Sequence, residues 1–500
     1  MRIERIEIRD FRGFPGQYHF DLGKGGNNLL VYGENGSGKS SLFHALKRFF
    51  EANAATDIQT QRNEFADEPE PCIKLEIAAY DESGDRDTES NIFEWSASAH
   101  PAASALIQQA NKTKGCLDYR SLLETHYVHR DRQHVEIFDL LIRTVLTHVQ
   151  NPISKNAFGE ELAGIRADRR KDMRGGAKEV YLRRIKEFNQ GLIAALETLN
   201  TQANLLLHGF FDDVELRLVP RGKLELTGTG RNKALVSPQV FVAATFCKQQ
   251  TRLDLHHFLN EARLSALAIA LYLATLLIIP PSRLRLLVLD DLLIGIDMSN
   301  RMAVLRILQE RFSNWQIILM THDRVWFEIV RMHTRHSKTW LNGSLRSRPD
   351  AEGKPVPLWK GYGEGWNTNL EVAKRHLEAD DIRAAGVYAR SAFEERLKRF
   401  CEDHQIPVRY TAEPSALKSD DFWKAVLKWI EGKGKKEDFS DVETKVEASR
   451  KLVLNPLSHE HPVNLVEGEI ALGLATVHLM DEQLRALFPK KASKPVEPDA

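Results

Sequence analysis

An octapeptide near the start of the chain has the composition and spacing of a phosphate-binding loop. Residues 33–40 read Gly-Glu-Asn-Gly-Ser-Gly-Lys-Ser. In such a loop the glycines let backbone N–H groups turn inward around phosphates, a lysine reaches the outer phosphates and a serine ligates Mg²⁺. We therefore expect a nucleotide site with Lys39 on the phosphates and Ser40 on the metal, lined by Gly33, Asn35, Gly36, Ser37, Gly38 and Ser41.

Two acidic residues supply the second half of such a site. Asp290 and Asp291 directly follow the apolar run 286–289, which reads as a buried strand. Asp290 would hold Mg²⁺ through its water shell, and Asp291 stands where a general base for an attacking water is needed. The alternative is a buried strand that merely ends in two solvated acids. The phosphate-binding loop earlier in the chain favours the metal-site interpretation.

A histidine follows another apolar strand. His322 lies in the sequence Thr-His-Asp that directly follows the apolar strand expected at residues 316–320. If the two strands are parallel neighbours, His322 reaches the same carboxyl edge as Asp290. There it could sense or orient a γ-phosphate.

Strands and helices alternate around these residues in the way a mostly parallel sheet requires. The strand 29–32 precedes the glycine loop, and apolar residues recur at helical spacing after it. The sequence thus predicts an α/β fold in which an ATPase head is interrupted by a short helical insertion and followed by an all-α domain. The expected parts are 1–120 (first half of the head), 121–210 (insertion or short arm), 211–330 (second half), 331–366 (basic connector), 367–488 (helical domain) and 489–500 (disordered tail).

Composition places few limits on function. The chain has 500 residues, of which 42% are hydrophobic, and equal numbers of basic and acidic residues, 69 each, so any nucleic-acid surface must be local. The four cysteines form no C-x-x-C pair, which fits a reducing compartment, with the cytoplasm as the default expectation. The apolar run 264–279 is too short for a typical membrane span and ends in two prolines, so we expect a buried helix and no membrane partner.

In their order along the chain, these elements resemble the RecF/SMC branch of the ABC ATPases. The resemblance covers about 330 residues, from an opening strand with Asp10-Phe11-Arg12-Gly13-Phe14 through Walker A, an insertion, a signature segment, Walker B and a D-loop to a switch histidine. It assigns the signature to residues 259–263 and implies that ATP and Mg²⁺ lie between two heads of a head-to-head dimer. Residues then implied to contact the nucleotide are Arg12, Asn260 and Asp297.

The chain departs from that family pattern in four places. Asn260, Glu261 and Ala262 replace Ser-Gly-Gly, and Asp291 replaces the usual glutamate, which predicts slow turnover or mainly a binding switch. A Q-loop glutamine is not identified, although residues 117–120 occupy the expected region. The insertion is short, because a helix over residues 179–207 spans only ~43 Å at ~1.5 Å per residue, which disfavours a condensin-like role.

The C-terminal part carries a second set of polar residues. Arg390 and Glu394 stand at i, i+4 within an amphipathic helix, and Arg450 precedes an Asn-x-x-Ser-His segment that ends at His459. The alternative is an intrahelical ion pair and turn chemistry in a domain that serves packing, dimerisation or partner binding. They also resemble HEPN-type domains of ATPase-coupled anticodon nucleases. That resemblance implies His459 as acid or base, Arg390 as a stabiliser of phosphorane charge and Glu394 as an orienting group.

Two basic stretches could contact DNA or RNA. One spans residues 155–186, and the other surrounds Trp340 in the expected connector. Solvated helical faces are the alternative explanation.

The resemblance implies a nucleotide-gated dimer or higher oligomer in prokaryotic anti-phage defence or genome surveillance. Such an ATPase would control a nuclease partner and respond to a phage-derived trigger. Two alternatives stay open, namely a self-contained ATP-gated ribonuclease and a RecF-like repair ATPase.

Overall fold

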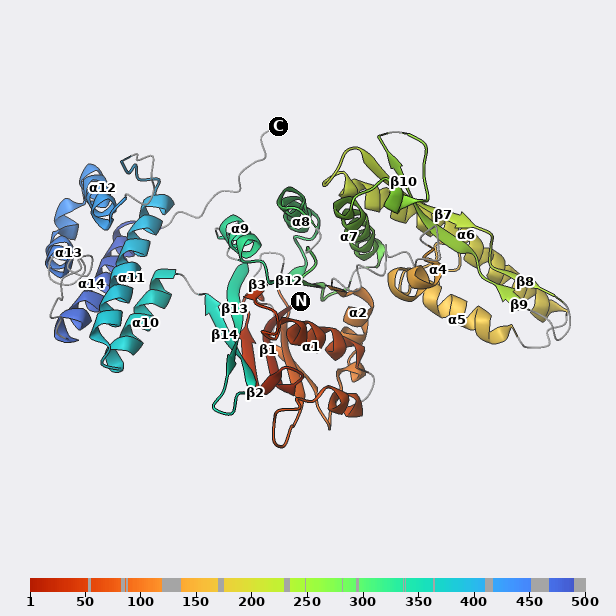
Figure 1. The fold of residues 1–500 in the computed structure, drawn as a ribbon, viewed down its shortest axis with the longest axis horizontal. Coiled ribbons are helices and arrows are strands. Elements are labelled where there is room, and N and C mark those ends of the chain that lie inside the picture. The colour runs from red at the N-terminus through yellow and green to blue at the C-terminus, as the bar shows by residue number, and fades with distance from the viewer. Residues whose placement is uncertain are drawn as a thin grey trace. The chain divides into compact units, whose positions relative to one another are not determined.

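The computed structural model describes the chain as two compact units, Met1–Gly361 and Tyr362–Ala500, each considered by itself (Figure 1). The description covers all residues except 53–54, 82–85, 87–88, 119–135, 170–174, 229–233, 248, 281, 294–295, 336, 338, 363–364, 410–416, 451–466 and 490–500.

The first unit is built around a six-stranded sheet. Its order is β14-β13-β3-β12-β11-β6, in which the run from β13 to β6 is parallel. The strands are β3 (Asn28–Gly33), β6 (Gly115–Asp118), β11 (Leu286–Asp290), β12 (Gln316–Thr321), β13 (Trp340–Pro349) and β14 (Pro355–Tyr362). Because β3, β6, β11 and β12 are parallel, the residues that follow them meet at one edge of the sheet. These are the glycine loop, the acids of β6 and β11, and His322.

A second, antiparallel sheet with order β2-β1-β4-β5 covers one side of the core. It consists of β1 (Arg2–Phe11), β2 (Phe14–Asp21), β4 (Cys72–Ala78) and β5 (Asn91–Trp95). Helix α1 (Lys39–Glu51) buries Leu42, Leu46 and Phe49 in the core that both sheets share. This packing fixes the start of α1, and hence the glycine loop, against the sheet edge.

Further helices complete the unit (Figure 1). They are α2 (Ala105–Thr113), α7 (Glu261–Ile278), α8 (Met298–Arg311) and α9 (Arg324–Thr334), with short 3₁₀ turns at Ala55–Gln61, Pro101–Ala103 and Leu255–His257. Phe327 of α9 packs on Tyr32 of β3, with ring centroids 5.7 Å apart. Helix α7 is long and apolar enough to cross a membrane, but 67% of that window is buried inside the protein, as expected for a core helix.

The insertion forms an arm of mixed structure. Its helical elements are α4 (Phe138–Leu140), a π-helical turn at Leu141–Val145, α5 (Phe158–Asp168) and α6 (Gly176–Leu207). The strands β7 (Val214–Arg221) and β10 (Gln239–Phe246) pair with each other, as do β8 (Glu225–Thr227) and β9 (Ala234–Val236). The Asn204 side chain exchanges hydrogen bonds of 2.7 and 2.9 Å with the backbone of Leu216. The arm therefore extends to about residue 246, and the second half of the head, expected from residue 211, resumes only with α7 and β11.

The expectation of a connector at 331–366 is also wrong for most of those residues. They include the end of α9 and the two strands β13 and β14, and β13 pairs with the glycine-loop strand β3 from Trp340↔Asn28 to Leu345↔Gly33. Arg346 and Arg348 are exposed at the end of β13, whereas Leu345 is buried in the core. Arg346 and Arg348, which contribute to the basic composition of residues 331–366, thus lie at the exposed end of the core strand β13.

The second unit is helical throughout its described residues. It contains α10 (Gly365–Glu378), α11 (Ile382–Asp403), α12 (Ser419–Gly432), α13 (Lys436–Ser449) and α14 (Glu467–Leu487) around a core of its own. The expected α/β head with an all-α C-terminal domain is thus confirmed as a fold class. His459 lies outside the described residues, as do residues 490–500 of the tail expected at 489–500.

Candidate nucleotide and metal site

The glycine loop joins β3 to α1 in the conformation that its glycines permit. Gly36 and Gly38 have φ values of +80° and +103°, which side chains disfavour. A Cβ on Gly33 would lie 2.3 Å from Ser37 Oγ and 2.8 Å from Leu345 O. The loop is therefore packed closely against β13, and only glycine fits at its first position.

Lys39 is almost completely buried at the start of α1. It is 4% exposed, and its Nζ donates to the carbonyl oxygens of Gly33 at 2.7 Å and Glu34 at 3.2 Å. The same Nζ lies 3.4 Å from Asp291 Oδ2. The loop thus curls around its own lysine, and a bound phosphate would have to replace some of these contacts.

Ser40 and Asp290 form the metal half of the site. Ser40 Oγ donates a 2.9 Å hydrogen bond to Asp290 Oδ2, although the two residues are 250 positions apart. Asp290 is 5% exposed, and its other oxygen, Oδ1, is buried without a partner in the described structure. A hydroxyl and a buried carboxylate with a spare oxygen are hard oxygen donors of the kind that Mg²⁺ prefers. These residues therefore fit the ion that the fold family implies.

Burial raises the pKa of Asp290 to about 6. The Ser40 hydrogen bond and Lys39 oppose that shift, while Asp291 and Asp118 add to it. In the absence of a cation, the charged form of Asp290 is thus disfavoured, mainly because the carboxylate is removed from water.

Asp291 connects Lys39 to His322. Its Oδ1 accepts from the His322 backbone N–H at 2.7 Å and lies 2.8 Å from His322 Nδ1, while Oδ2 faces Lys39. The backbone of Asp291 is left-handed, with φ of +49°, a conformation that Asp tolerates better than most residues. The structure thereby brings together Lys39, Ser40, Asp290, Asp291 and His322.

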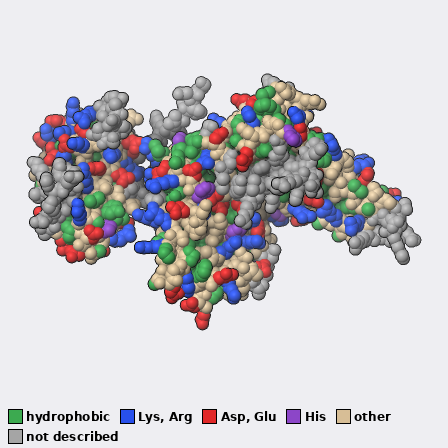
Figure 2. All heavy atoms as spheres, in the orientation of Figure 1, with side chains coloured by type: hydrophobic (Ala, Val, Ile, Leu, Met, Phe, Trp, Pro, Cys, Tyr) green, Lys and Arg blue, Asp and Glu red, His purple; other side chains and the backbone are tan. Residues whose placement is uncertain are grey.

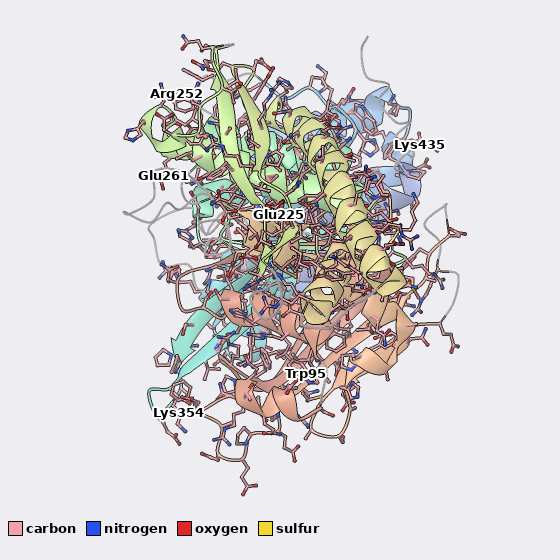
Figure 3. All side chains as sticks on the ribbon, turned by 90° about the vertical axis from the view of Figure 1, so that its right-hand side faces the viewer. Trp95, Glu225, Arg252, Glu261, Lys354 and Lys435 are labelled. Carbon is pink, nitrogen blue, oxygen red and sulfur yellow. The ribbon has the colours of Figure 1, made fainter. Side chains whose placement is uncertain are left out.

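The residues assigned to the signature and D-loop begin helices. Asn260 caps α7 by accepting from Arg263 N at 3.0 Å, and Asp297 caps α8 by accepting from the Asn300 backbone at 3.2 Å. Asn260 and Glu261 are exposed, and Figure 3 shows Glu261 at the rim of the molecule. Any contact of Asn260 or Asp297 with a nucleotide would require the second head of a dimer, and we treat it under the proposed function.

Sequence inspection missed the way in which α7 is anchored to the arm. Arg263 donates to Asp213 at 2.7 Å, and its guanidinium lies 5.1 Å from the Phe211 ring centroid and 4.9 Å from that of Phe246. Phe211 and Asp213 precede β7, and Phe246 ends β10. The first turn of α7, the helix that follows the expected signature, is thus held against the arm by Arg263.

The opening strand is tied to α1 through Ser41. Ser41 Oγ accepts from Gly13 N at 3.1 Å, next to Arg12, which is exposed and has a φ of +49°. Burial of part of the side chain and the neighbouring Arg48 lower the pKa of Arg12. In this structure Ser41 holds the loop that carries Arg12.

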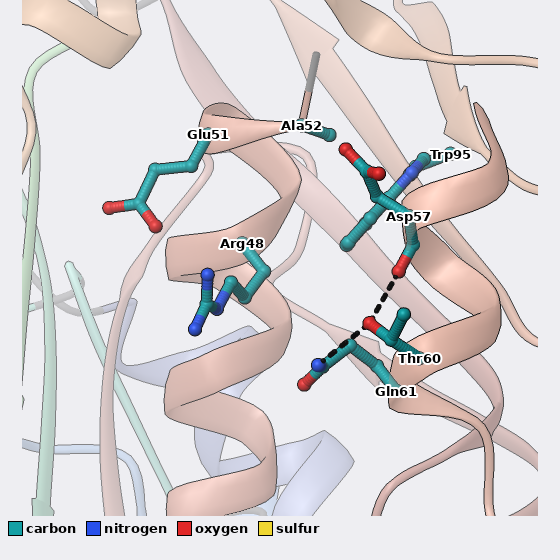
Figure 4. Close-up of a pocket in the computed structure, with 7 residues that line it drawn as sticks. All are labelled: Arg48, Glu51, Ala52, Asp57, Thr60, Gln61 and Trp95. Atoms are coloured by element: carbon teal, nitrogen blue, oxygen red, sulfur yellow. Dashed lines mark hydrogen bonds between the residues drawn. The ribbon is translucent and has the colours of Figure 1, made fainter. Parts of the chain in front are cut away.

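A small pocket lies at the far end of α1 from the glycine loop (Figure 4). It is lined by Arg48, Glu51, Ala52, Asp57, Thr60, Gln61 and Trp95. At ~1.5 Å per residue, the nine residues from Lys39 to Arg48 span ~14 Å. This pocket is therefore separate from the phosphate-binding residues.

In the second unit, Arg390 Nε donates to Glu394 Oε1 at 2.9 Å along α11, which is the intrahelical ion pair. Arg450 is buried and bound to Asp420 at 2.5 Å and to Glu447 at 2.7 Å, with Trp423 below its guanidinium. These contacts indicate that Arg450 has a structural role in packing the second unit. Because His459 is outside the described residues, the structure does not test the expected HEPN site.

Several cations of the basic stretches have acidic partners. Within 155–186, Arg184 pairs with Asp168 at 2.7 Å and Arg183 with Glu187 at 3.8 Å, and farther on Arg331 pairs with Glu328 at 2.8 Å. Basic and acidic side chains are interspersed over the face drawn in Figure 2. These contacts agree with the solvated-face alternative for the residues concerned.

A glycine loop between strand and helix, facing a strand that ends in two acids, defines the P-loop ATPase class. The family model for the RecF/RecN/SMC N terminal domain matches residues 2–339, about two-thirds of the chain, and the protein belongs to that family of ATPases. No curated protein matches the chain in sequence.

Solved structures with a similar fold include three SMC heads. An Smc head bound to the C-winged helix domain of ScpA has 13% identity and a TM-score of 0.42, covering 73% of this chain and 100% of its own. An Smc head with an extended coiled coil, bound to the C-terminal domain of ScpA derived from Pyrococcus furiosus, has 13% identity and a TM-score of 0.43, covering 76% and 99%. The SMC head domain from Thermotoga maritima has 14% identity and a TM-score of 0.34, covering 73% and 100%.

Proposed function

We propose that the protein binds and hydrolyses ATP with Mg²⁺, and that the nucleotide gates its association with a second copy. The observation that carries this proposal is the Ser40–Asp290 hydrogen bond beside the buried Lys39, with Asp290 Oδ1 left over for a metal-bound water. When bound, Mg²⁺ would neutralise phosphate charge and polarise the terminal phosphoryl group.

Each residue of the site has a separate role in the proposed reaction. Lys39 leaves Asp291 to hold the outer phosphates, and Ser40 and Asp290 hold the cation. Asp291, freed from Lys39, accepts a proton from the attacking water, while His322 keeps its carboxylate in place through Oδ1. Because the Asp291 side chain is one methylene shorter than the glutamate of the family pattern, it would hold the attacking water less well, and we expect turnover to be slow.

A head-to-head dimer would complete the site. Asn260 and Glu261 are exposed at the start of α7, where a partner's phosphates could approach the helix N-terminus. Asp297 would face the same interface as a D-loop residue. We propose a homodimer or higher oligomer formed on ATP binding.

ATP hydrolysis by purified protein, measured beside Lys39→Ala and Asp290→Ala variants, tests the enzymatic proposal. Hydrolysis that continues unchanged in both variants would contradict it. Light scattering with and without a non-hydrolysable ATP analogue measures the mass of the protein in solution and so tests nucleotide-gated dimerisation. The same mass in both conditions would contradict this part of the proposal.

For the biological setting we propose prokaryotic anti-phage defence or genome surveillance, with a nuclease partner and a phage-derived trigger, in the cytoplasm. The support is the resemblance to short-armed ATPases with extra helical domains. Helix α6 has 32 residues, ~48 Å at ~1.5 Å per residue, far short of a long coiled-coil arm. Co-purification of a nuclease that leaves after ATP addition would support this setting.

A self-contained ribonuclease is the second candidate, because the half-buried Arg390–Glu394 pair matches two of its three proposed residues. Incubation with transfer RNA and ATP, beside His459→Ala and Lys39→Ala variants, tests it. RNA that stays intact in every nucleotide state would exclude this candidate.

A further inference from the structure

The end of β1 and the turn into β2 contain two residues whose backbone is left-handed. Asp10 and Arg12 have φ values of +45° and +49°, a conformation that residues with a side chain rarely adopt. Such residues keep this conformation only where their surroundings hold it, and they are frequent at ligand sites. Arg12 is also one of the residues implied to contact the nucleotide. The groups that hold its backbone therefore bear on the candidate site.

A buried asparagine holds the Arg12 backbone. Asn63 is fully buried, and its Nδ2 donates to Arg12 O at 2.5 Å. The backbone N–H of Asn63 donates to Asp10 O at 2.7 Å, and Arg12 N donates to Gln61 O at 2.8 Å. Residues 61–63 thus bind both polar groups of the Arg12 backbone.

The Asn63 amide is itself held in one orientation. Its Oδ1 accepts from the backbone N–H groups of Phe65 at 2.8 Å and Ala66 at 2.9 Å. A flipped amide would lose both of these bonds, so the Nδ2 end faces Arg12 O. Asparagine therefore supplies the donor and the acceptor that this position needs, whereas alanine would leave Arg12 O without this partner.

The turn that contains Arg12 lies against the phosphate-binding loop. Gly13 N donates to Ser41 Oγ, in the first turn of α1, at 3.1 Å. A Cβ on Gly38 would lie 3.4 Å from the Phe14 ring. Because Arg12 directly precedes Gly13, its backbone is fixed beside the residues proposed to hold the phosphates and the metal.

Arg12 also lies among other cations. Burial first, and then Arg12, Lys47 and Arg48, lower the pKa of His44 on α1 to about 4, with Asp118 acting in the opposite direction. Arg12 and Arg48 are exposed, and neither they nor Lys47 form an ion pair with an acid among the described residues. A fixed guanidinium beside further cations favours an anion, and its planar fork of donors suits a phosphate.

We propose that Asn63 is a positioning residue, which holds the backbone of Arg12 so that the Arg12 guanidinium can bind a phosphate of ATP. This inference rests on the proposed function, since the ligand is the nucleotide of that site. Asn63 touches no phosphate itself and acts through Arg12. Removal of Asn63 should therefore change nucleotide affinity only while Arg12 is present.

A double-mutant cycle on the full chain tests this dependence. Titration calorimetry measures the affinity for a non-hydrolysable ATP analogue with Mg²⁺ in wild type, Arg12→Ala, Asn63→Ala and the double variant. Loss of a charge-assisted bond to phosphate should lower the affinity about tenfold or more in Arg12→Ala, and Asn63→Ala should lower it several-fold. The double variant should bind about as weakly as Arg12→Ala, because the effects of residues that act through one contact do not add. Unchanged affinity in either single variant, or losses that multiply in the double variant, would overturn the proposal.

A second substitution of Asn63 separates its bond to Arg12 from its other bonds. Asn63→Asp keeps an acceptor for Phe65 and Ala66 but replaces the donor to Arg12 O by an oxygen. It should therefore lose analogue affinity as Asn63→Ala does, and it takes the place of Asn63→Ala in the cycle if that variant does not fold. Wild-type affinity in Asn63→Asp would overturn the proposal.

Asn151 in the arm provides the matched control. It is also fully buried, and its Oδ1 accepts from the backbone N–H groups of Ile153 at 2.9 Å and Ser154 at 3.4 Å. Asn151→Ala should lower the melting temperature without changing analogue affinity. An affinity loss equal to that of Asn63→Ala would show that general destabilisation is the cause and would overturn the proposal. If wild type binds no analogue at all, the proposed function itself fails.

Discussion

Lys39 Nζ lies 3.4 Å from Asp291 Oδ2, so the phosphate-binding lysine and the expected general base form an ion pair within one site. The other Asp291 oxygen is bound by His322. ATP binding must therefore exchange a lysine–carboxylate contact for a lysine–phosphate contact, and the same exchange releases the base. Nucleotide binding and activation of the base are coupled through a single side chain.

Asp291→Asn should separate binding from hydrolysis. The amide has nearly the same shape and tolerates the left-handed backbone, but it cannot accept a proton from water. We expect hydrolysis to fall by about 10²–10⁴-fold, while ATP affinity is unchanged or higher because Lys39 loses its internal anion. Single-turnover assays and equilibrium binding check this, and equal hydrolysis by variant and wild type would exclude Asp291 as the base.

Asp290→Asn should stabilise the nucleotide-free protein in a pH-dependent way. Burial raises the pKa of Asp290 to about 6, so the folded state holds a proton more tightly than the unfolded state, and stability falls as pH rises toward and through 6. Compared with an ordinary aspartate, the cost above pH 6 is at most about 3 kcal/mol.

Thermal unfolding at pH 8 and at pH 4.5 measures this difference. The melting temperature of Asp290→Asn should exceed that of wild type at pH 8, with a smaller difference at pH 4.5. A gain of the same size at both pH values would show that charge burial is not its cause. Mg²⁺ with ATP should stabilise wild type but not the variant.

The contacts of Arg263 between α7 and the arm predict that its substitution lowers the stability of the protein without any loss of nucleotide contact. Arg263→Ala removes the contacts with Asp213, Phe211 and Phe246, and we expect destabilisation of roughly 1–3 kcal/mol. Arg263→Lys keeps the charge but loses the planar stacking, so it should recover only part of that loss. Denaturant unfolding measures both variants, and full recovery by lysine would argue against a role for stacking.

Two arginines of the second unit, Arg450 and Arg390, differ in burial and should therefore differ in their contribution to stability. Arg450 is buried, whereas its partners Asp420 and Glu447 are 42% and 37% exposed and keep contacts with Lys424 and Trp423. Arg450→Ala therefore removes two hydrogen bonds and the packing on Trp423 and should cost roughly 1–3 kcal/mol. Arg390 shares a more exposed pair on α11, so Arg390→Ala should cost about 1 kcal/mol or less. Calorimetry should show the larger change only in the transition of the second unit. A small change for Arg450→Ala would contradict its assignment as a packing residue.

The site could be predicted well from sequence because its residues sit at the ends of apolar strands. Once β3, β11 and β12 are parallel neighbours, Lys39, Asp290 and His322 must converge. The pairing itself was less predictable, since alternation identifies a strand without naming its neighbour. For this reason the pattern after residue 211 does not distinguish strands of the arm from strands of the head. Residues 331–366 resemble a connector in composition because Arg346 and Arg348 outweigh Leu341 and Leu345.

The partners of individual side chains were the least predictable part. Arg263 carries no motif that points to Asp213, fifty residues earlier. The register of Asp118 opposite Asp290 likewise depends on a strand of only four residues, β6. Such contacts follow from three-dimensional packing and not from spacing.

The pairing of β13 with β3 has a practical consequence for dissecting the protein. A recombinant fragment ending at residue 330 would lack β13 and β14, leaving the strand before the glycine loop with bare backbone N–H and C=O groups along one side. Exposed edges of this kind promote aggregation. A cut after Tyr362, the last residue of β14, keeps the sheet whole. We therefore expect separately expressed parts of the chain to be soluble only when they are divided there.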